Sequence, residues 1–187
     1  MILNDVEITG LAAGGMIRPF VAVSTKGPGG TSYGLSSFGY DIRIGREWVE
    51  FRTNNDVPLE IGEITEDDVK RTRADEFVIR PGSFVLAHTM EFIDVPRDCL
   101  GFVTDKSSLA RFGITLQTTV LEAGWRGQVT LELFNNNCRP VRLRAGMGVA
   151  QVVFQRGKPC RTSYADRKGK YQGQSGVTLP RASEVAA

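Results

Sequence analysis

The feature that most constrains the fold is a succession of short apolar stretches separated by turn residues. In residues 127–137, Val129, Leu131 and Leu133 alternate with polar side chains, which is the period of a strand buried on one face. Further stretches of this kind occupy residues 40–51, 77–96, 100–105, 114–120 and 139–155. Turns such as Pro-Gly separate several of them. Many short strands with little helix predict an all-β barrel or sandwich.

Three segments depart from the strand pattern. Asn4 and Glu7 have the spacing of a capping box, which predicts a short helix that ends near Gly14. Residues 106–113 predict one helical turn stopped by glycine, and Ser107 or Ser108 could cap it. The charged residues 64–76 fit either a surface helix or a loop.

Bulk composition excludes several classes of protein. The 187 residues suit a single domain with a real core. A net charge of +2 gives no global sign of nucleic-acid or membrane binding, and no apolar stretch has membrane length. The start of the chain lacks a signal-peptide pattern, and three widely spaced cysteines fit reduced thiols. We therefore expect a cytoplasmic protein.

The end of the chain is basic and rich in glycine. Six basic residues and one acidic residue, Asp166, lie between Arg156 and Lys170. Little apolar periodicity follows, so residues 163–187 are predicted to form an arm. The basic run could be a solvated surface or an anion site, and glycines in the arm would let its backbone close over a ligand.

Glu132 raises a question of function. It lies on the polar face of its predicted strand, where a carboxylate is usually exposed. Phe134 shares that face, and an aromatic side chain there indicates that the face is covered. A covered carboxylate needs a partner or a chemical role.

A second candidate site is the predicted helical turn. Free N–H groups at a helix start attract phosphate, and Lys106 adds a positive charge. Arg111 follows Ser107 by four residues, so about one helical turn brings them to one side. Taken alone, this pattern also fits an N-cap with a surface arginine.

Four motifs together resemble the dCTP deaminase family of the trimeric dUTPase-like superfamily. They are SSFGYDIRI, DKSSLARFGI, TTVLEAGWRGQVTLELFN and SYADRKGKYQGQSGVTLPR. The resemblance runs from about Tyr33 to Arg181. It implies a distorted jelly-roll β barrel with a short N-terminal helix, assembled into homotrimers with active sites between subunits. It also implies that the arm closes over the nucleotide and that dCTP, with Mg²⁺ on its triphosphate, is hydrolysed to dUTP and ammonia for pyrimidine deoxynucleotide synthesis.

The resemblance also assigns roles to individual residues. The family's catalytic residues match Glu132, Ser107 and Arg111. Its triphosphate contacts match Lys106, Ser107, Ser108, Arg111, Tyr164, Lys170 and Gln174. A weaker match places sugar and base contacts at Thr119, Val120, Leu121 and Glu122.

The chemistry favours a carboxylate base over a zinc-bound hydroxide. Zinc deaminases carry H-x-E and P-C-x-x-C signatures. The single histidine, His88, is followed by Thr-Met-Glu, and the cysteines are 39 and 22 positions apart. We therefore expect no zinc and no metal ligands from protein side chains. His88 is expected to be structural.

Three functions stay open from the sequence. The first is a monofunctional dCTP deaminase. The second is a bifunctional deaminase and dUTP diphosphatase that ends at dUMP, although Glu122 stands where related enzymes place an aspartate. The third is a non-catalytic nucleotide-binding module, for which loss of the glutamate, serine or arginine would be expected.

Overall fold

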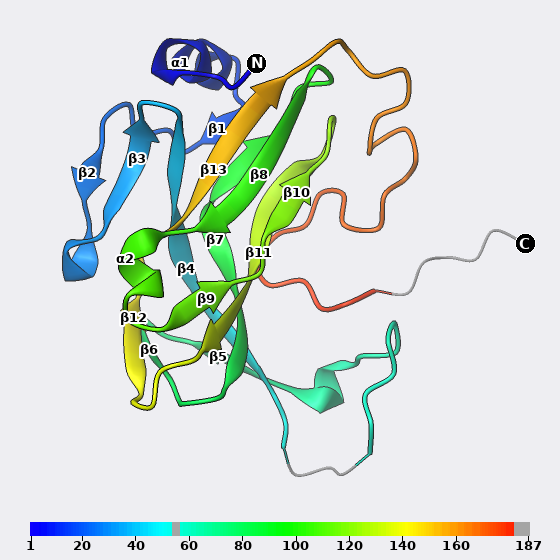
Figure 1. Ribbon diagram of the computed structural model, residues 1–187. Helices are drawn as coiled ribbons and strands as arrows, with labels where there is room; N and C mark the ends of the chain where they lie inside the picture. Colours follow the sequence, from blue (N-terminus) through cyan, green and yellow to red (C-terminus); the bar gives the residue numbers. More distant parts are fainter. Residues whose placement is uncertain (54–56, 182–187) are drawn as a thin grey trace, which may run out of the picture.

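The computed structural model describes residues 1–53 and 57–181 and is built mainly of antiparallel strands (Figure 1). Its strands are β1 (Ile17–Arg18), β2 (Thr25–Lys26), β3 (Ser32–Ser36), β4 (Gly39–Phe51), β5 (Val69–Arg73), β6 (Glu76–Ile79), β7 (Phe84–Asp94), β8 (Cys99–Asp105), β9 (Ile114–Leu116), β10 (Thr119–Leu121), β11 (Arg126–Asn135), β12 (Val141–Arg144) and β13 (Gly148–Arg156). Its α-helices are α1 (Asp5–Ala13) and α2 (Ser107–Ala110), and its 3₁₀ turns are η1 (Pro28–Gly30) and η2 (Glu66–Asp68). The predicted mainly β architecture is confirmed.

One long strand joins the two halves of the curled sheet. The main path runs β10-β8-β13-β4-β7-β11-β9. The first part of β4, from Tyr40 to Arg43, pairs with β13, and the part from Ile44 to Glu50 pairs with β7. Because β4 belongs to both halves, the sheet wraps around a core, as expected for a distorted barrel. β12 and β6 form a separate two-stranded sheet.

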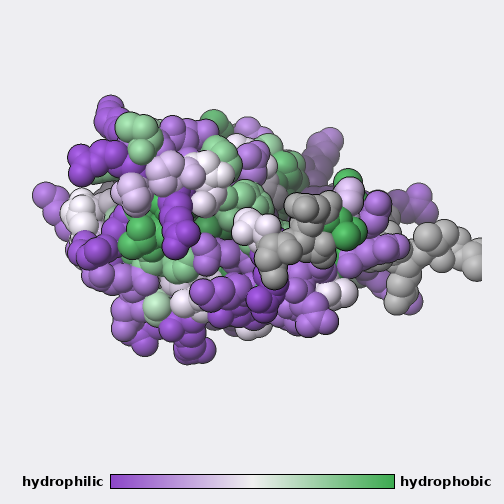
Figure 2. Space-filling model, turned by 90° about the horizontal axis from the view of Figure 1, so that it is seen from below, coloured by the Kyte–Doolittle hydropathy of each residue, from purple (hydrophilic) through white to green (hydrophobic). Residues whose placement is uncertain are grey.

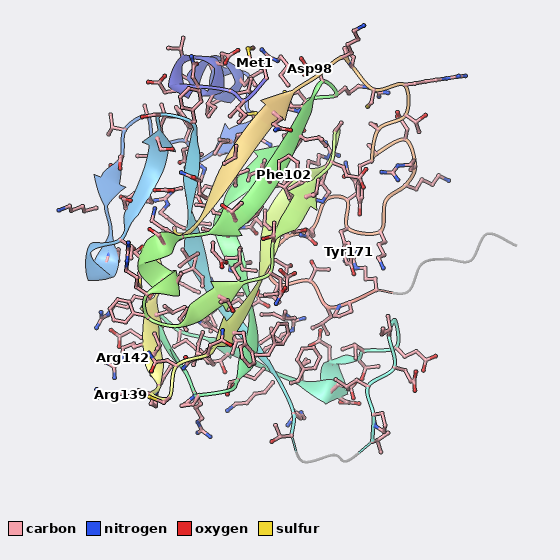
Figure 3. The ribbon with its side chains drawn as sticks, viewed as in Figure 1. Met1, Asp98, Phe102, Arg139, Arg142 and Tyr171 are labelled. Atoms are coloured by element: carbon pink, nitrogen blue, oxygen red, sulfur yellow. The ribbon has the colours of Figure 1, made fainter. Side chains whose placement is uncertain are left out.

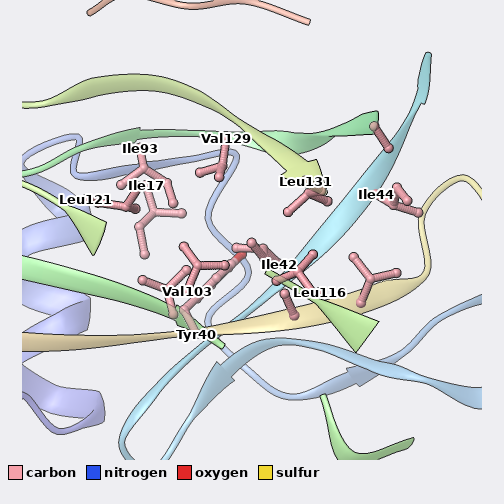
Figure 4. Packing of buried hydrophobic residues seen from close by; sticks show 14 of the residues in the cluster. Ile17, Tyr40, Ile42, Ile44, Ile93, Val103, Leu116, Leu121, Val129 and Leu131 are labelled. Carbon is pink, nitrogen blue, oxygen red and sulfur yellow. The ribbon is translucent and has the colours of Figure 1, made fainter. Parts of the chain in front are cut away.

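Alternation along the strands fills the core. Tyr40, Ile42 and Ile44 of β4 are fully buried, and Val129 and Leu131 of β11 are almost fully buried. Figure 4 shows these side chains meeting between the two halves. Their burial on one face of β11 leaves Glu132 on the opposite face.

Both predicted helices are present, but the second is capped differently from the expectation. The side chain of Asn4 accepts a hydrogen bond from Glu7 N and completes a capping box on α1, which ends at Ala13 with Gly14 as its C-cap. Helix α2 begins after Lys106 without any side-chain cap, so neither Ser107 nor Ser108 caps it.

The charged residues 64–76 form neither of the expected structures throughout. After the short turn η2 they enter strand β5, which pairs with β4. Arg71 of β5 forms an ion pair with Glu47, which lies diagonally across from it on β4. Tertiary pairing thus overrides a local composition without apolar periodicity.

Residues 163–181, the described part of the arm, contain no regular helix or strand, yet they pack against the body. Gln174 forms an isolated parallel bridge with Gly127 of β11. Gly127 has φ of +152°, and a Cβ there would lie 2.9 Å from Gln174 O, so glycine permits the close approach. Residues 182–187 of the predicted arm lie outside the described residues. In the described part of the chain, no helix has the length and apolar character needed to cross a membrane.

Candidate active site

A pocket of about 260 Å³ lies between the outer face of the sheet and the arm. Strands β7 and β11 contribute Phe84, Leu86, Thr130 and Glu132, and the arm contributes Tyr164, Tyr171 and Gln174. In Figure 3, Tyr171 lies on the arm side of the molecule, opposite Arg139 and Arg142. The arm therefore covers the face on which the sequence predicted a covered carboxylate.

Burial in this pocket changes the acidity of Glu132. Its removal from water raises the pKa of the carboxyl from 4.5 to about 7, because burial disfavours the charged form. The opposing effect within the described part of the chain comes from the residue's own backbone N–H. Near neutral pH the group can thus both accept and release a proton.

The arm residues predicted to bind the nucleotide do not all face the pocket. Tyr164 and Gln174 line it, and the Tyr164 hydroxyl accepts a hydrogen bond from Tyr171 N at 3.0 Å. Lys170 is exposed, and its ammonium donates to Arg181 O at 3.1 Å and lies over the Tyr171 ring. Lys170 itself does not line the pocket.

Of the four residues predicted to contact the sugar and base, three line the pocket and one does not. Thr119, Val120 and Leu121 line the pocket from strand β10. Glu122 does not line it and instead forms an ion pair with Arg167 of the arm. The acidic side chain thus fastens the arm rather than pointing at the space available to a ligand.

Four predicted site residues lie elsewhere on the chain. Lys106, Ser107, Ser108 and Arg111 belong to or flank α2, and none of them lines the pocket. Helix α2 and the arm lie on opposite sides of the molecule in Figure 1. One copy of the chain therefore does not bring Ser107 and Arg111 to Glu132.

The residues around α2 make polar contacts of their own and border a separate groove. The Lys106 ammonium is largely buried in an ion pair with Asp41, and Asp41 also accepts a hydrogen bond from Ser32 Oγ at 3.1 Å. The Ser108 hydroxyl is buried without a hydrogen-bond partner in the described part of the chain. It lies beside a groove of about 330 Å³ that Phe112 and Arg142 also line.

His88 and Trp125 both make contacts within the fold. His88 Nδ1 lies 2.8 Å from Thr89 O, so a local contact satisfies the ring as predicted. Trp125 belongs to the core and also borders the pocket, and its Nε1 donates to Tyr171 O at 3.0 Å.

Sequence reasoning missed the apolar wall of the pocket. Phe51, Phe84 and Leu86 face the pocket from β4 and β7, and Pro180 closes it from the arm. Apolar residues at outward-facing positions of neighbouring strands were the available signal, because such positions are usually polar when only one face is buried. Seen from below, hydrophobic side chains are exposed among hydrophilic ones (Figure 2).

Comparison with known proteins decides the family. A family model described as dCTP deaminase-like matches residues 2–157. The chain belongs to the dCTP deaminase-like family. The match begins almost at the N-terminus, ahead of the motifs that carried the resemblance, and it ends at residue 157, before the arm.

Relatives within the family cover nearly the whole chain. A dCTP deaminase of Pseudomonas fluorescens is 45% identical over 172 residues, which is 90% of this chain and 92% of that protein. A dCTP deaminase of Novosphingobium aromaticivorans is 44% identical over 182 residues, which is 96% of this chain and 98% of that protein.

A solved structure of a family member supports the fold. The crystal structure of 2'-deoxycytidine 5'-triphosphate deaminase from Agrobacterium tumefaciens matches with a TM-score of 0.64 and 20% identity. The match covers 83% of this chain and 48% of that one.

Proposed function

We propose that this protein hydrolyses dCTP to dUTP and ammonia, with Glu132 as the general base. The observation that carries the proposal is a glutamate on the wall of a pocket beneath the arm, with its pKa raised to about 7. Membership of the dCTP deaminase-like family supplies the substrate class. The dUTP formed would supply pyrimidine deoxynucleotide synthesis.

The proton steps follow from the acidity of Glu132. The ionised carboxylate takes a proton from a water molecule as the water oxygen adds to C4 of cytosine. The protonated Glu132 then donates that proton to N3. A second proton from the added hydroxyl, carried by Glu132 to the amino group, lets ammonia leave as the C4 carbonyl forms. Acid–base help of this kind is worth roughly 10²–10⁴-fold in rate.

The protein residues are proposed to work without a metal ligand set of their own. The sequence lacks the zinc-deaminase signatures, and the described residues contain no cluster of three or more His, Cys, Asp or Glu side chains suited to a metal. Magnesium enters as part of the substrate, bound to the triphosphate. Lys170, whose ammonium lies over the ring of the pocket residue Tyr171, is proposed to bind that triphosphate.

The active site is proposed to be shared between copies of the chain in a homotrimer. Helix α2, with Ser107 and Arg111, lies away from the pocket that holds Glu132. A neighbouring copy could present its α2 to this pocket and supply the serine to orient water or the amino group. Its arginine could orient the carboxylate or offset charge on the pyrimidine.

A first experiment distinguishes the functions that the sequence left open. Purified protein is incubated with dCTP and Mg²⁺, and nucleotides, ammonia and pyrophosphate are measured. We expect dUTP with equal ammonia and no pyrophosphate, and a loss of roughly 10²-fold or more in Glu132→Gln. The exposed carboxylate of Glu63 provides the matched control, Glu63→Gln, which should retain full activity.

The other outcomes overturn parts of the proposal. Release of dUMP and pyrophosphate would establish the bifunctional enzyme, against which the Glu122–Arg167 ion pair argues. Binding of dCTP without turnover would establish a nucleotide-binding module. Near-normal turnover by Glu132→Gln would remove Glu132 from the role of base.

Mixing two variants that each lose most but not all activity tests the shared site. Glu132→Gln retains α2, and Arg111→Ala retains the pocket carboxylate. If each site takes its pocket from one copy and α2 from another, random reassembly of equal amounts restores about one quarter of wild-type activity. If both parts came from one chain, mixing would restore none.

A further inference from the structure

The arm segment that follows Gln174 is held to the sheet in an unusual way. Three consecutive backbone N–H groups donate to side-chain oxygens of the body. Gly176 N donates to Gln128 Oε1 at 2.8 Å, and Val177 N donates to Glu47 Oε2 at 3.4 Å. Thr178 N donates to Thr130 Oγ1 at 3.1 Å. Side chains thus replace the backbone ladder that would hold an ordinary edge strand.

Two of the three acceptor side chains, Gln128 and Glu47, also make contacts with other groups of the body. Gln128 Nε2 donates to Thr89 O at 2.8 Å, so the amide is oriented with its oxygen toward the arm. The Glu47 carboxylate pairs with Arg71, and Arg71 Nη1 donates to Val177 O at 3.1 Å. Gln128 and Glu47 are thus oriented by groups of the body as well as by the arm, which lowers the entropy lost when the arm binds.

The fit also depends on the shape of the arm. Gly176 has φ of +65°, and a Cβ there would lie 2.6 Å from Glu47 Oε2. Only glycine adopts this conformation without strain and allows the carboxylate so close. Val177 is buried beside Val49 and Leu86, so apolar packing adds to the hydrogen bonds.

Gln128 and Glu47, which accept the hydrogen bonds of Gly176 and Val177, are called the latch residues, and they lie outside the candidate active site. They line a separate hollow of about 550 Å³ that Ser175 and Gly176 also border. The arm therefore runs between the two hollows. Gln174 and Thr178, on either side of the latched segment, line the pocket that holds Glu132. Whatever holds Gly176 and Val177 also sets the position of these two pocket residues.

We propose that Gln128 and Glu47, with Arg71, are positioning residues that latch the arm closed and so set the affinity for the nucleotide. The inference rests on the proposed function, since it concerns the substrate of the same pocket. The latch favours the closed position of the arm, and an unlatched arm lowers the fraction of protein competent to bind. That change raises KM while the chemical step, which Glu132 performs, is retained.

The test uses the full-length protein and two substitutions of Gln128. Gln128→Met keeps the size of the side chain but removes the acceptor, whereas Gln128→Glu keeps an acceptor for Gly176. In Gln128→Met we expect KM for Mg·dCTP to rise about fivefold, from the loss of the hydrogen bond that Gly176 N donates to Gln128, with kcat within about twofold. Gln128→Glu should recover most of the KM. The exposed Gln155 provides the control, Gln155→Met, which should match the wild type.

Hydrogen exchange without ligand provides a second readout that does not depend on activity. The amides of Gly176, Val177 and Thr178 should exchange about tenfold faster in Gln128→Met, and Glu47→Gln should also loosen Val177. Wild-type exchange in Gln128→Met would overturn the latch. Faster exchange with an unchanged KM would overturn its role in substrate binding. If the wild-type protein did not convert dCTP, the proposed function would fail, and exchange would still decide whether the latch exists.

Discussion

Replacing Glu132 by glutamine should stabilise the folded protein, by an amount that depends on pH. Burial raises the pKa of this carboxyl from 4.5 to about 7 in the fold, so the folded state binds a proton more tightly than the unfolded chain does. Between these two values the unfolded state has released its proton and the folded state has not. The free energy of unfolding contributed by this group therefore falls as pH rises from about 4.5 to about 7.

The magnitude follows from linkage. Each pKa unit corresponds to about 1.4 kcal/mol, so above about pH 8 the ionised Glu132 costs the fold about 3 kcal/mol. At pH 5 the cost is about 1 kcal/mol, because the folded state is still protonated. Glutamine does not titrate, so the stability of Glu132→Gln relative to wild type should increase by about 2 kcal/mol between pH 5 and pH 8.

Urea unfolding at several pH values measures this difference. Protein concentration is kept constant, since the apparent stability of an oligomer depends on it. The control is Glu63→Gln, because Glu63 is exposed and its substitution should give a difference that does not follow the Glu132 titration. A Glu132→Gln difference that is flat between pH 5 and pH 8 would refute the reasoning, since it would show that burial leaves the carboxyl in its ordinary range.

Three further predictions concern other parts of the molecule. If Arg111 of a neighbouring copy lies close to Glu132, Arg111→Ala should move the acidic limb of the kcat/KM pH profile to higher pH, because an adjacent cation lowers a carboxyl pKa. An acidic limb at the same pH would show that the arginine lies away from Glu132. Gly127→Ala should raise KM for dCTP about tenfold or more, as a Cβ 2.9 Å from Gln174 O displaces the arm; an unchanged KM measured in steady-state assays would contradict this. Asn4→Ala should lower the free energy of unfolding by about 1 kcal/mol through loss of the capping box, while kcat and KM stay unchanged. Urea unfolding and steady-state assays measure these quantities, and a changed kcat or KM would show that α1 contributes to the site.

Local pattern predicted most of the strands because it records burial directly. Val129, Leu131 and Leu133 alternate with polar residues, and all three are buried in β11. Asn4 and Glu7 likewise predicted α1, because capping depends on residues close in the chain. The charged residues 64–76 could not be predicted in this way, since β5 depends on pairing with β4, far along the chain.

The candidate site was predicted in part. Phe134 beside Glu132 indicated that the outer face is covered, but the sequence could not show that the chain's own arm covers it. It also could not show that Glu122 pairs with Arg167 or that Lys106 pairs with Asp41. These contacts join residues 45 and 65 positions apart, and only the folded backbone determines which charged groups meet.

The sequence by itself determined the strand pattern, the capped first helix and the resemblance that names the chemistry, because periodicity, capping and motif order are properties of neighbouring residues. The tertiary structure alone decided the environment of Glu132, the latch on the arm and the separation of α2 from the pocket. These depend on which distant segments share one face of the sheet, and burial in that shared space raises the pKa of Glu132 to about 7. The pKa of a carboxyl rises in this way because the fold removes the group from water, and the local sequence does not contain that information.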